Sequence, residues 1–209
     1  MPRVDLAVPF GEDEEARRLG ARWDKERKVW FVPEGVDRSP FHRWRPKTID
    51  VRSATYYIAQ GPEICWKCSQ PIHVFAFILP AGYEVLMIDE DSEAGEEDEE
   101  EDCWETMEDV GMLSYIEYLS PTVQSRIGAL APHYRRAHSK AAHMWYWMNH
   151  CPTCGSPQGD HYLFREPQGG FLPTEFDAAR TIRLHRIDQP LQAAAAYGEA
   201  ESFAYLWRT

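Results

Sequence analysis

The sequence lacks any long uninterrupted run of apolar residues. Arg3, Asp5 and the charged residues 12–18 interrupt the N-terminal region, so it does not have the pattern of a signal peptide. No later segment approaches the roughly 20 apolar residues that a membrane-spanning helix needs. We therefore expect a cytoplasmic protein with no membrane partner.

The sequence also lacks the short motifs that mark common enzyme families. It contains no GxSxG motif, no phosphate-binding Walker loop and no HExxH motif. Gly169 and Gly170 form a glycine turn that is too short to cradle phosphate. The sequence therefore favours a binding protein over an enzyme, and it leaves open an active site assembled from residues far apart in the chain.

One acidic segment lacks basic residues altogether. Residues 89–105 contain 12 of the 34 Asp and Glu residues, and the remaining 22 equal the 22 Lys and Arg residues. The net charge of −12 therefore belongs to this segment and says little about the rest of the surface. Like-charge, low-complexity stretches predict a disordered, solvated insertion at about 89–105. Docking on a basic protein partner is the alternative role for it.

The N-terminal residues 1–47 predict a small β-α-β module. A strand, a helix, a second strand and a short helical turn are expected at 4–8, 11–19, 29–32 and 40–44. Gly20 is expected to end the helix, and Asp24 to cap the charged turn that follows.

The body, residues 48–190, is predicted to be mainly β, which makes the whole protein α+β. A chain of 209 residues with 44% apolar content can build a substantial core. A turn is expected at Gly61 and Pro62, and the alanine-rich residues 191–209 predict a C-terminal helix or tail. The strands are expected at 49–59, 73–79, 143–150, 161–164 and 182–187, and the helices at 122–130 and 174–180.

Four of the five cysteines form two CxxC pairs, Cys65 with Cys68 and Cys151 with Cys154. Each pair is followed by small or polar residues and a turn, which is typical of a zinc knuckle, and two knuckles supply the four thiolates of a tetrahedral zinc site. The 82 residues between Cys68 and Cys151 exceed the spacing of a compact finger. We expect a zinc-ribbon-like site in which a structural zinc ion holds two distant parts of the body together.

Other assignments of these side chains are weaker. Two disulfides are disfavoured in a reducing compartment, free buried thiols are another alternative, and a redox CxxC usually lies at a strand-to-helix junction. Replacement of a ligand by His73 or His150, and catalysis by Cys103 in its acidic surroundings, are further alternatives. A second metal site formed by His133, His138 and His143 is disfavoured, and catalysis by Cys103 is the least favoured of these alternatives.

The first module interleaves basic and aromatic residues between positions 17 and 30. Basic side chains neutralise phosphates and exposed indoles stack on bases, so this composition suits single-stranded nucleic acid. Trp30 is expected in the core, and nearby acidic residues dilute the positive charge. The candidate nucleic-acid contacts are Arg17, Arg18, Arg22, Trp23, Arg27 and Lys28.

The stretch VPFGEDEEARRLGARWDKERKVWFVPEGVD, residues 8–37, resembles a small uncharacterised module of bacterial plasmid- and conjugation-associated proteins, some of them primase-like. The remainder, with CWKC and WMNHCPTCG, is similar to uncharacterised proteobacterial proteins of the same layout. The resemblance implies a bacterial source and a nucleic-acid-processing setting in some relatives. The residues that match the module's pattern are Leu19, Gly20, Ala21, Trp23, Asp24, Trp30 and Pro33.

Taken together, these observations predict a zinc-stabilised bacterial binding or adaptor protein. Its expected partner is nucleic acid, preferably single-stranded, or a nucleic-acid-processing protein. A regulatory factor that acts through the acidic segment, and an enzyme whose site is not visible in the sequence, remain the alternatives.

Overall fold

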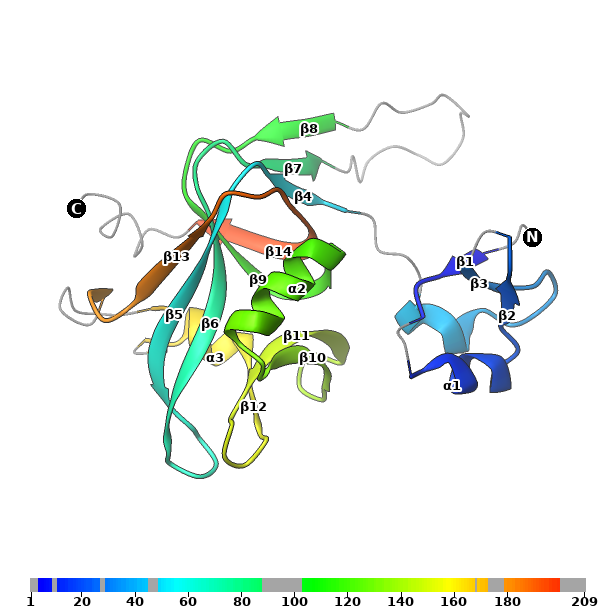
Figure 1. Cartoon of the computed structure of the whole chain (residues 1–209), viewed down its shortest axis with the longest axis horizontal. Helices are drawn as coiled ribbons and strands as arrows, with labels where there is room; N and C mark the ends of the chain where they lie inside the picture. The colour runs from blue at the N-terminus through cyan, green and yellow to red at the C-terminus, as the bar shows by residue number, and fades with distance from the viewer. Residues whose placement is uncertain are drawn as a thin grey trace. The chain divides into compact units, whose positions relative to one another are not determined.

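The computed structural model describes residues 4–8, 11–26, 29–44, 49–87, 103–167, 169–172 and 179–199. The chain divides into two compact units, Met1–Thr48 and Ile49–Thr209 (Figure 1). The boundary lies one residue beyond the predicted one. No helix among the described residues is long and apolar enough to cross a membrane.

The N-terminal unit is built on a three-stranded antiparallel sheet with the strand order β1-β3-β2. The predicted β-α-β module is not confirmed in that form, because the strand β2 precedes β3 and the two form a hairpin. Trp23 lies opposite Trp30 in this hairpin, and this cross-strand aromatic pair favours strand over turn. The elements are β1 (Val4–Leu6), α1 (Asp13–Arg18), β2 (Arg22–Asp24), β3 (Val29–Val32) and the 3-10 helix η1 (Ser39–Trp44).

The helix α1 has an acidic first turn and a basic last turn, as the helix dipole favours. Gly20 follows it with a φ of 105°, a left-handed conformation that suits glycine and ends the helix. The Asp24 carboxylate accepts a hydrogen bond from the Glu26 N–H at 3.0 Å, as predicted for this turn. The core of the unit consists of Leu6, Ala16, Ala21, Trp30, Val32, Phe41 and Trp44.

The body is mainly β, as predicted. An eight-stranded antiparallel sheet has the order β13-β5-β6-β9-β14-β4-β7-β8, and a three-stranded sheet has the order β10-β11-β12 (Figure 1). The strands of the larger sheet are β4 (Val51–Ser53), β5 (Tyr56–Ile64), β6 (Pro71–Leu79), β7 (Glu84–Met87), β8 (Cys103–Thr106), β9 (Gly111–Leu119), β13 (Arg183–Ile187) and β14 (Leu191–Glu199). The other elements are α2 (Pro121–Leu130), β10 (Tyr134–Ser139), β11 (Met144–His150), β12 (Pro157–Gln158) and α3 (Asp160–Arg165).

Two hydrophobic cores lie on opposite faces of the large sheet. Successive residues of a strand point to opposite faces, so Phe77 packs in the first core and Ile78 in the second. The first core includes α2, through Val123 and Ile127. The second includes α3, through Leu163, and it also contains Cys65 and Cys151. Two of the four cysteines of the CxxC pairs are therefore part of a packed core.

Gly61 and Pro62 do not form the predicted turn. Both belong to β5, where they pair with Val74 and His73 of β6. The neighbouring strand β13 pairs with β5 only as far as Gln60, so Pro62 lies where β5 has no partner on its other side. Proline is tolerated in an edge strand because its missing N–H is not needed there.

Three further segments have a secondary structure that differs from the predicted one. Residues 161–164 are helical in α3, because Leu163 is buried on one side of a short helix. Residues 191–199 form the strand β14, since pairing with both β9 and β4 outweighs the helix propensity of alanine. Residues 103–105 belong to β8 and pair with β7. The rest of the acidic segment, most of the predicted helix at 174–180, and residues 200–209 lie outside the described residues.

Candidate metal centre and nucleic-acid interface

The four cysteines of the two CxxC pairs converge on one point. Their sulfur atoms lie within 4.8 Å of one another. The Sγ atoms of Cys65 and Cys154 are 3.7 Å apart, and those of Cys68 and Cys151 are 3.6 Å apart. The structure therefore brings together the four predicted ligands, and such a group can hold a metal ion.

The two knuckles follow the same backbone path. The Cys65 N–H donates to the Gln70 carbonyl at 2.9 Å, and the Cys151 N–H donates to the Ser156 carbonyl at 2.9 Å. The first knuckle joins β5 to β6, and the second joins β11 to β12. Two hairpins, one from each sheet, thus offer two sulfurs each in equivalent conformations.

A left-handed residue lies at the same position of each knuckle. Ser69 has a φ of 56° and Gly155 a φ of 69°. Their N–H groups donate to the carbonyls of Cys65 and Cys151, each at 2.9 Å. Serine is unusual in this conformation, so the turn geometry is imposed by its surroundings.

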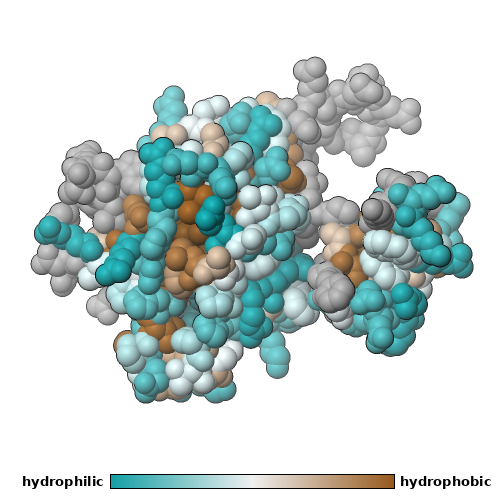
Figure 2. Space-filling view, viewed as in Figure 1, coloured by the Kyte–Doolittle hydropathy of each residue, from teal (hydrophilic) through white to brown (hydrophobic). Residues whose placement is uncertain are grey.

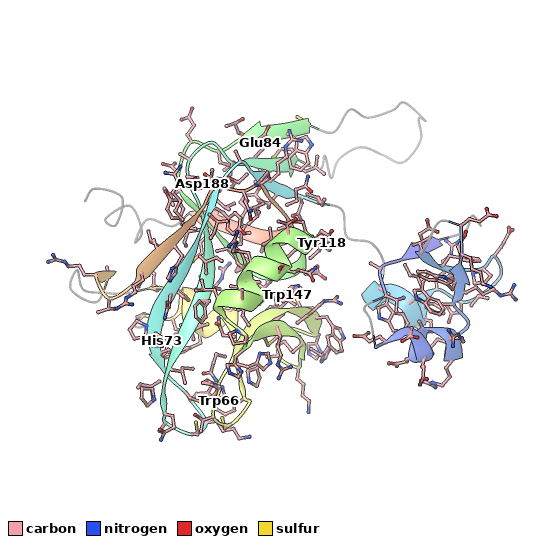
Figure 3. The ribbon with its side chains drawn as sticks, in the orientation of Figure 1. Trp66, His73, Glu84, Tyr118, Trp147 and Asp188 are labelled. Atoms are coloured by element: carbon pink, nitrogen blue, oxygen red, sulfur yellow. The ribbon has the colours of Figure 1, made fainter. Side chains whose placement is uncertain are left out.

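Side chains other than the cysteines link the two hairpins by hydrogen bonds. The Asn149 amide accepts from the Phe75 N–H at 2.8 Å and donates to the Phe75 carbonyl at 2.9 Å. The Trp66 indole N–H donates to the Pro157 carbonyl at 2.7 Å, across from one knuckle to the other. Trp66 is labelled in Figure 3 at the end of the β5–β6 hairpin. Neither bridge was predicted from the sequence, although an asparagine within the aromatic segment 144–150 was a signal for the first.

Polar groups lie against the sulfurs of Cys65 and Cys154 and favour the ionised form of these two. The Ser156 hydroxyl lies 3.3 Å from the Cys65 sulfur and 3.1 Å from the Cys154 sulfur. The Gln158 amide nitrogen lies 3.5 Å from the Cys65 sulfur. The pKa of Cys154 is lowered, chiefly by the Ser156 hydroxyl. Hydrogen bonds of this kind orient thiolates and tune a metal site.

The pKa values of the two cysteines in the first knuckle move in opposite directions. Burial disfavours the Cys65 thiolate, but hydrogen bonds from Ser156, Cys68 and Lys67 outweigh it and lower its pKa to about 5. A backbone hydrogen bond from Gln70 favours the Cys68 thiolate, yet burial and the neighbouring thiols raise its pKa to about 12. Adjacent sulfurs repel when both are ionised, so one loses its proton early and another late. A bound cation displaces the remaining protons, and metal binding therefore releases protons.

The two histidines considered as alternative ligands, and the cysteine considered as a nucleophile, are not part of the four-sulfur cluster. The His150 ring is buried and its Nδ1 lies 3.0 Å from the Met148 carbonyl oxygen. Cys103 is exposed on β8, and His73 is exposed on β6. Among the described residues, the four cysteines form the only group of three or more Cys, His, Asp or Glu side chains placed to share a metal ion. The alternative of a second metal site at His133, His138 and His143 is therefore not found in the described part of the chain.

We expect Ser156→Ala to weaken metal binding by roughly 10- to 100-fold, as loss of an outer partner typically does. The substitution removes a hydroxyl that contacts two sulfurs while leaving the knuckle backbone intact. Competition with a chromophoric chelator measures the change. Thr153→Ala is the matched control, because it removes an exposed hydroxyl from the same knuckle. Equal affinities for both variants would show that the Ser156 hydroxyl has no such role.

The candidate nucleic-acid residues of the N-terminal unit lie on or near its surface. Arg17, Arg18 and Arg22 are exposed, and Trp23 is 46% exposed. Hydrophilic side chains cover much of the visible face of this unit (Figure 2). Arg27 and Lys28 lie outside the described residues.

An aromatic pair supports the exposed Trp23. Its ring meets the buried Trp30 edge to face at 5.6 Å between centroids. The Arg17 guanidinium lies 5.4 Å from the centroid of the same Trp30 ring. Arg18 approaches Glu15 at 3.8 Å, so part of its charge is offset. Arg22 and Trp23 are therefore the exposed cation and indole of β2, and as successive strand residues they lie on opposite faces of this edge strand.

A buried acidic group in the body was not predicted. Asp160 at the start of α3 is 2% exposed, and its Oδ2 accepts a hydrogen bond from the Tyr115 N–H at 2.7 Å. Its Oδ1 is buried and has no hydrogen-bond partner among the described residues. Burial raises the pKa of Asp160 to about 7, against the opposing hydrogen bond from Tyr115. Tyr115 has a φ of 49° where the β9 pairing with β14 shifts register.

Comparisons with known proteins concern only part of the chain. Residues 3–46 match the family described as "Domain of unknown function (DUF5710)". Two proteins of Escherichia coli, both named DNA primase TraC, are 52% and 51% identical to this chain over 42 residues. Those matches cover 20% of this chain and 4% and 3% of the relatives. No solved structure matches the chain. The predicted resemblance of the N-terminal module to one in primase-like proteins is confirmed.

Proposed function

We propose that this chain is a zinc-stabilised binding protein that contacts single-stranded nucleic acid through its N-terminal unit. The observation that carries the proposal is the exposed pair Arg22 and Trp23, in a unit similar to part of DNA primase TraC. A single strand that crosses the sheet edge at β2 can stack a base on the Trp23 indole on one face and place a phosphate near the Arg22 guanidinium on the other.

The donor set of the metal centre supports zinc as its ion. Four thiolates suit zinc or an iron–sulfur cluster, and knuckle-type CxxC turns are typical of tetrahedral zinc. Four protein ligands complete the coordination of zinc, so no position remains for a catalytic water. We therefore assign the ion a structural role, which requires a reducing compartment such as the cytoplasm to keep the thiols free.

The charge of the N-terminal surface limits the kind of nucleic acid that it can bind. Its acidic residues in α1 oppose a broad positive field, so we expect contact with a short stretch of single strand. Duplex binding usually depends on many phosphate contacts. A nucleic-acid-processing protein is the competing partner, and it requires no direct affinity for an oligonucleotide.

We expect Arg22→Ala with Trp23→Ala to weaken binding of a fluorescent single-stranded oligonucleotide. Loss of stacking costs about 1–3 kcal/mol per base, and loss of one phosphate contact reduces the salt slope by about 0.7. Anisotropy titrations at several salt concentrations measure both quantities. Arg183→Ala, which removes an exposed cation from β13, is the control.

Unchanged affinity of the double variant would contradict the proposal. Trp23→Phe keeps an aromatic ring on Trp30 and distinguishes a lost base contact from a disturbed hairpin. Recovery of binding in this variant is the expected result.

A further inference from the structure

The β10–β11 hairpin of the body carries a second set of basic and aromatic side chains. We infer that the tip of this hairpin binds single-stranded nucleic acid, with Trp145 stacking on a base and Lys140 contacting a phosphate. This surface is separate from the N-terminal one, and each can be tested without the other.

The charge around the hairpin differs from that of the whole chain. Between Glu117 and Asp160 the sequence contains no Asp or Glu, although the chain has a net charge of −12. The same stretch contains Arg126, Arg135, Arg136 and Lys140. A local excess of positive charge in an acidic protein gives this surface electrostatic complementarity to a polyanion.

The pairing of the hairpin places basic and aromatic residues on one face. Arg136 lies opposite Trp147, and His138 lies opposite Trp145. Alternate residues of a strand share a face, so these four side chains form a single row across the two strands. Lys140 follows directly after β10 and is exposed.

The Trp145 ring is held by its neighbours while part of it faces solvent. The His138 ring meets it edge to face at 5.7 Å between centroids. The Arg136 guanidinium lies 5.9 Å from its centroid. His138 is exposed, and Trp145 is partly exposed. A tryptophan oriented before binding loses little side-chain entropy when a base stacks on it.

The base of the hairpin is anchored in the first core. Tyr134 is buried and stacks on Trp147, with 6.2 Å between centroids and 20° between ring planes. Trp147 also packs against the residues of that core. Figure 3 labels Trp147 on the hairpin, beside α2. Trp145, nearer the tip, is not among the residues of either core of the body.

The chain offers a matched control for this arrangement. The Arg52 guanidinium lies 4.1 Å from the centroid of Trp104, which gives a second arginine and tryptophan pair on the body. The Glu84 carboxylate accepts two hydrogen bonds from Arg52, at 2.7 Å and 3.0 Å, and neutralises it. Arg52 and Trp104 thus have the same two chemical groups as Arg136 and Trp145, but Glu84 neutralises the charge of Arg52.

The test measures binding of a fluorescent oligothymidylate to metal-loaded full-length protein at several salt concentrations. Trp145→Ala is expected to weaken binding by about 5- to 150-fold, and Trp145→Phe to retain most of it. Lys140→Ala is expected to reduce the salt slope by about 0.7, and Lys140→Arg to leave it unchanged. Trp104→Ala is expected to bind as the unaltered protein does.

Equal affinity of Trp145→Ala and the unaltered protein would overturn the inference. Displacement of the oligothymidylate by poly-glutamate with no effect of Trp145→Ala would also overturn it, since it would show a general polyanion or acidic-protein surface.

Photocrosslinking to a thiouridine-containing strand, followed by trypsin, locates the contact independently. Crosslinks in residues 141–165 support the inference. Crosslinks confined to residues 1–45 would overturn it while leaving the proposed function of the N-terminal unit intact.

Discussion

Replacement of Cys151 by serine is expected to lower the melting temperature of the body by at least about 10 °C. Structural zinc binding contributes about 10–16 kcal/mol in finger peptides, whereas whole domains are stable by only about 5–15 kcal/mol. A loss of even about 5 kcal/mol lowers the melting temperature of a domain of this size by about 10–20 °C. The loss is large here because Cys65 and Cys151 are each 1% exposed and belong to the second core.

The same experiment has an internal control in the fifth cysteine. Cys103→Ser changes an exposed thiol on β8, outside the four-sulfur cluster, and should leave the melting curve unchanged. Circular dichroism follows the unfolding, and metal analysis with thiol titration follows the site. Substoichiometric metal with a Cys151→Ser variant as stable as the unaltered protein would contradict a structural metal.

Replacement of Asp160 by asparagine is expected to destabilise the protein at acid pH and to stabilise it at alkaline pH. The pKa of Asp160 is raised to about 7 in the folded protein, whereas an unfolded aspartate titrates near 3.9. The folded protein therefore favours the protonated form of Asp160 over its ionised form, and protonation of Asp160 stabilises the fold. That contribution, about 4 kcal/mol, is fully present below about pH 4 and is lost as the pH rises through 7.

The variant keeps an acceptor for the Tyr115 N–H but cannot ionise. Its amide nitrogen replaces a buried oxygen that has no partner, so we expect a cost of about 1–3 kcal/mol at acid pH. At alkaline pH the unaltered protein must hold a buried carboxylate, and the variant is expected to gain relative to it. Between about pH 5.5 and 8.5 the difference in stability should change by about 2 kcal/mol in favour of the variant.

Urea unfolding of both proteins at each pH measures this difference, and any change in metal binding affects both alike. Asp109→Asn, at an exposed position, is the control and should show no such trend. Parallel stability curves for Asp160→Asn and the unaltered protein would mean that Asp160 is ionised in the fold throughout this range.

The sequence predicted the parts of the molecule that local chemistry determines. The CxxC spacing identified the four cysteines that come together because a knuckle is a local turn, and Pro121 marked the first turn of α2. It could not show how the knuckles meet, since Asn149 achieves this by hydrogen bonding to Phe75 from a distant strand. Likewise, β14 became a strand through partners on both sides, which a single alanine-rich segment does not reveal.

Side-chain groupings that form across separate elements were predicted least completely. The candidate contacts of the N-terminal unit could be predicted because basic and aromatic residues are adjacent in the chain there. At the β10–β11 hairpin, the pairing of Arg136 with Trp147 and of His138 with Trp145 depends on the register of two strands. Asp160 and Tyr115 come from α3 and β9, and only the folded body brings them together.

The central claim, that this protein binds single-stranded nucleic acid, is tested most directly by one titration. Metal-loaded full-length protein is added to a fluorescent single strand and, separately, to a duplex of the same sequence, across a range of salt concentrations. The account predicts tighter binding of the single strand, with the logarithm of the affinity falling linearly with the logarithm of the salt concentration. Absence of binding to the single strand at low salt, in protein shown to contain its metal, would contradict it.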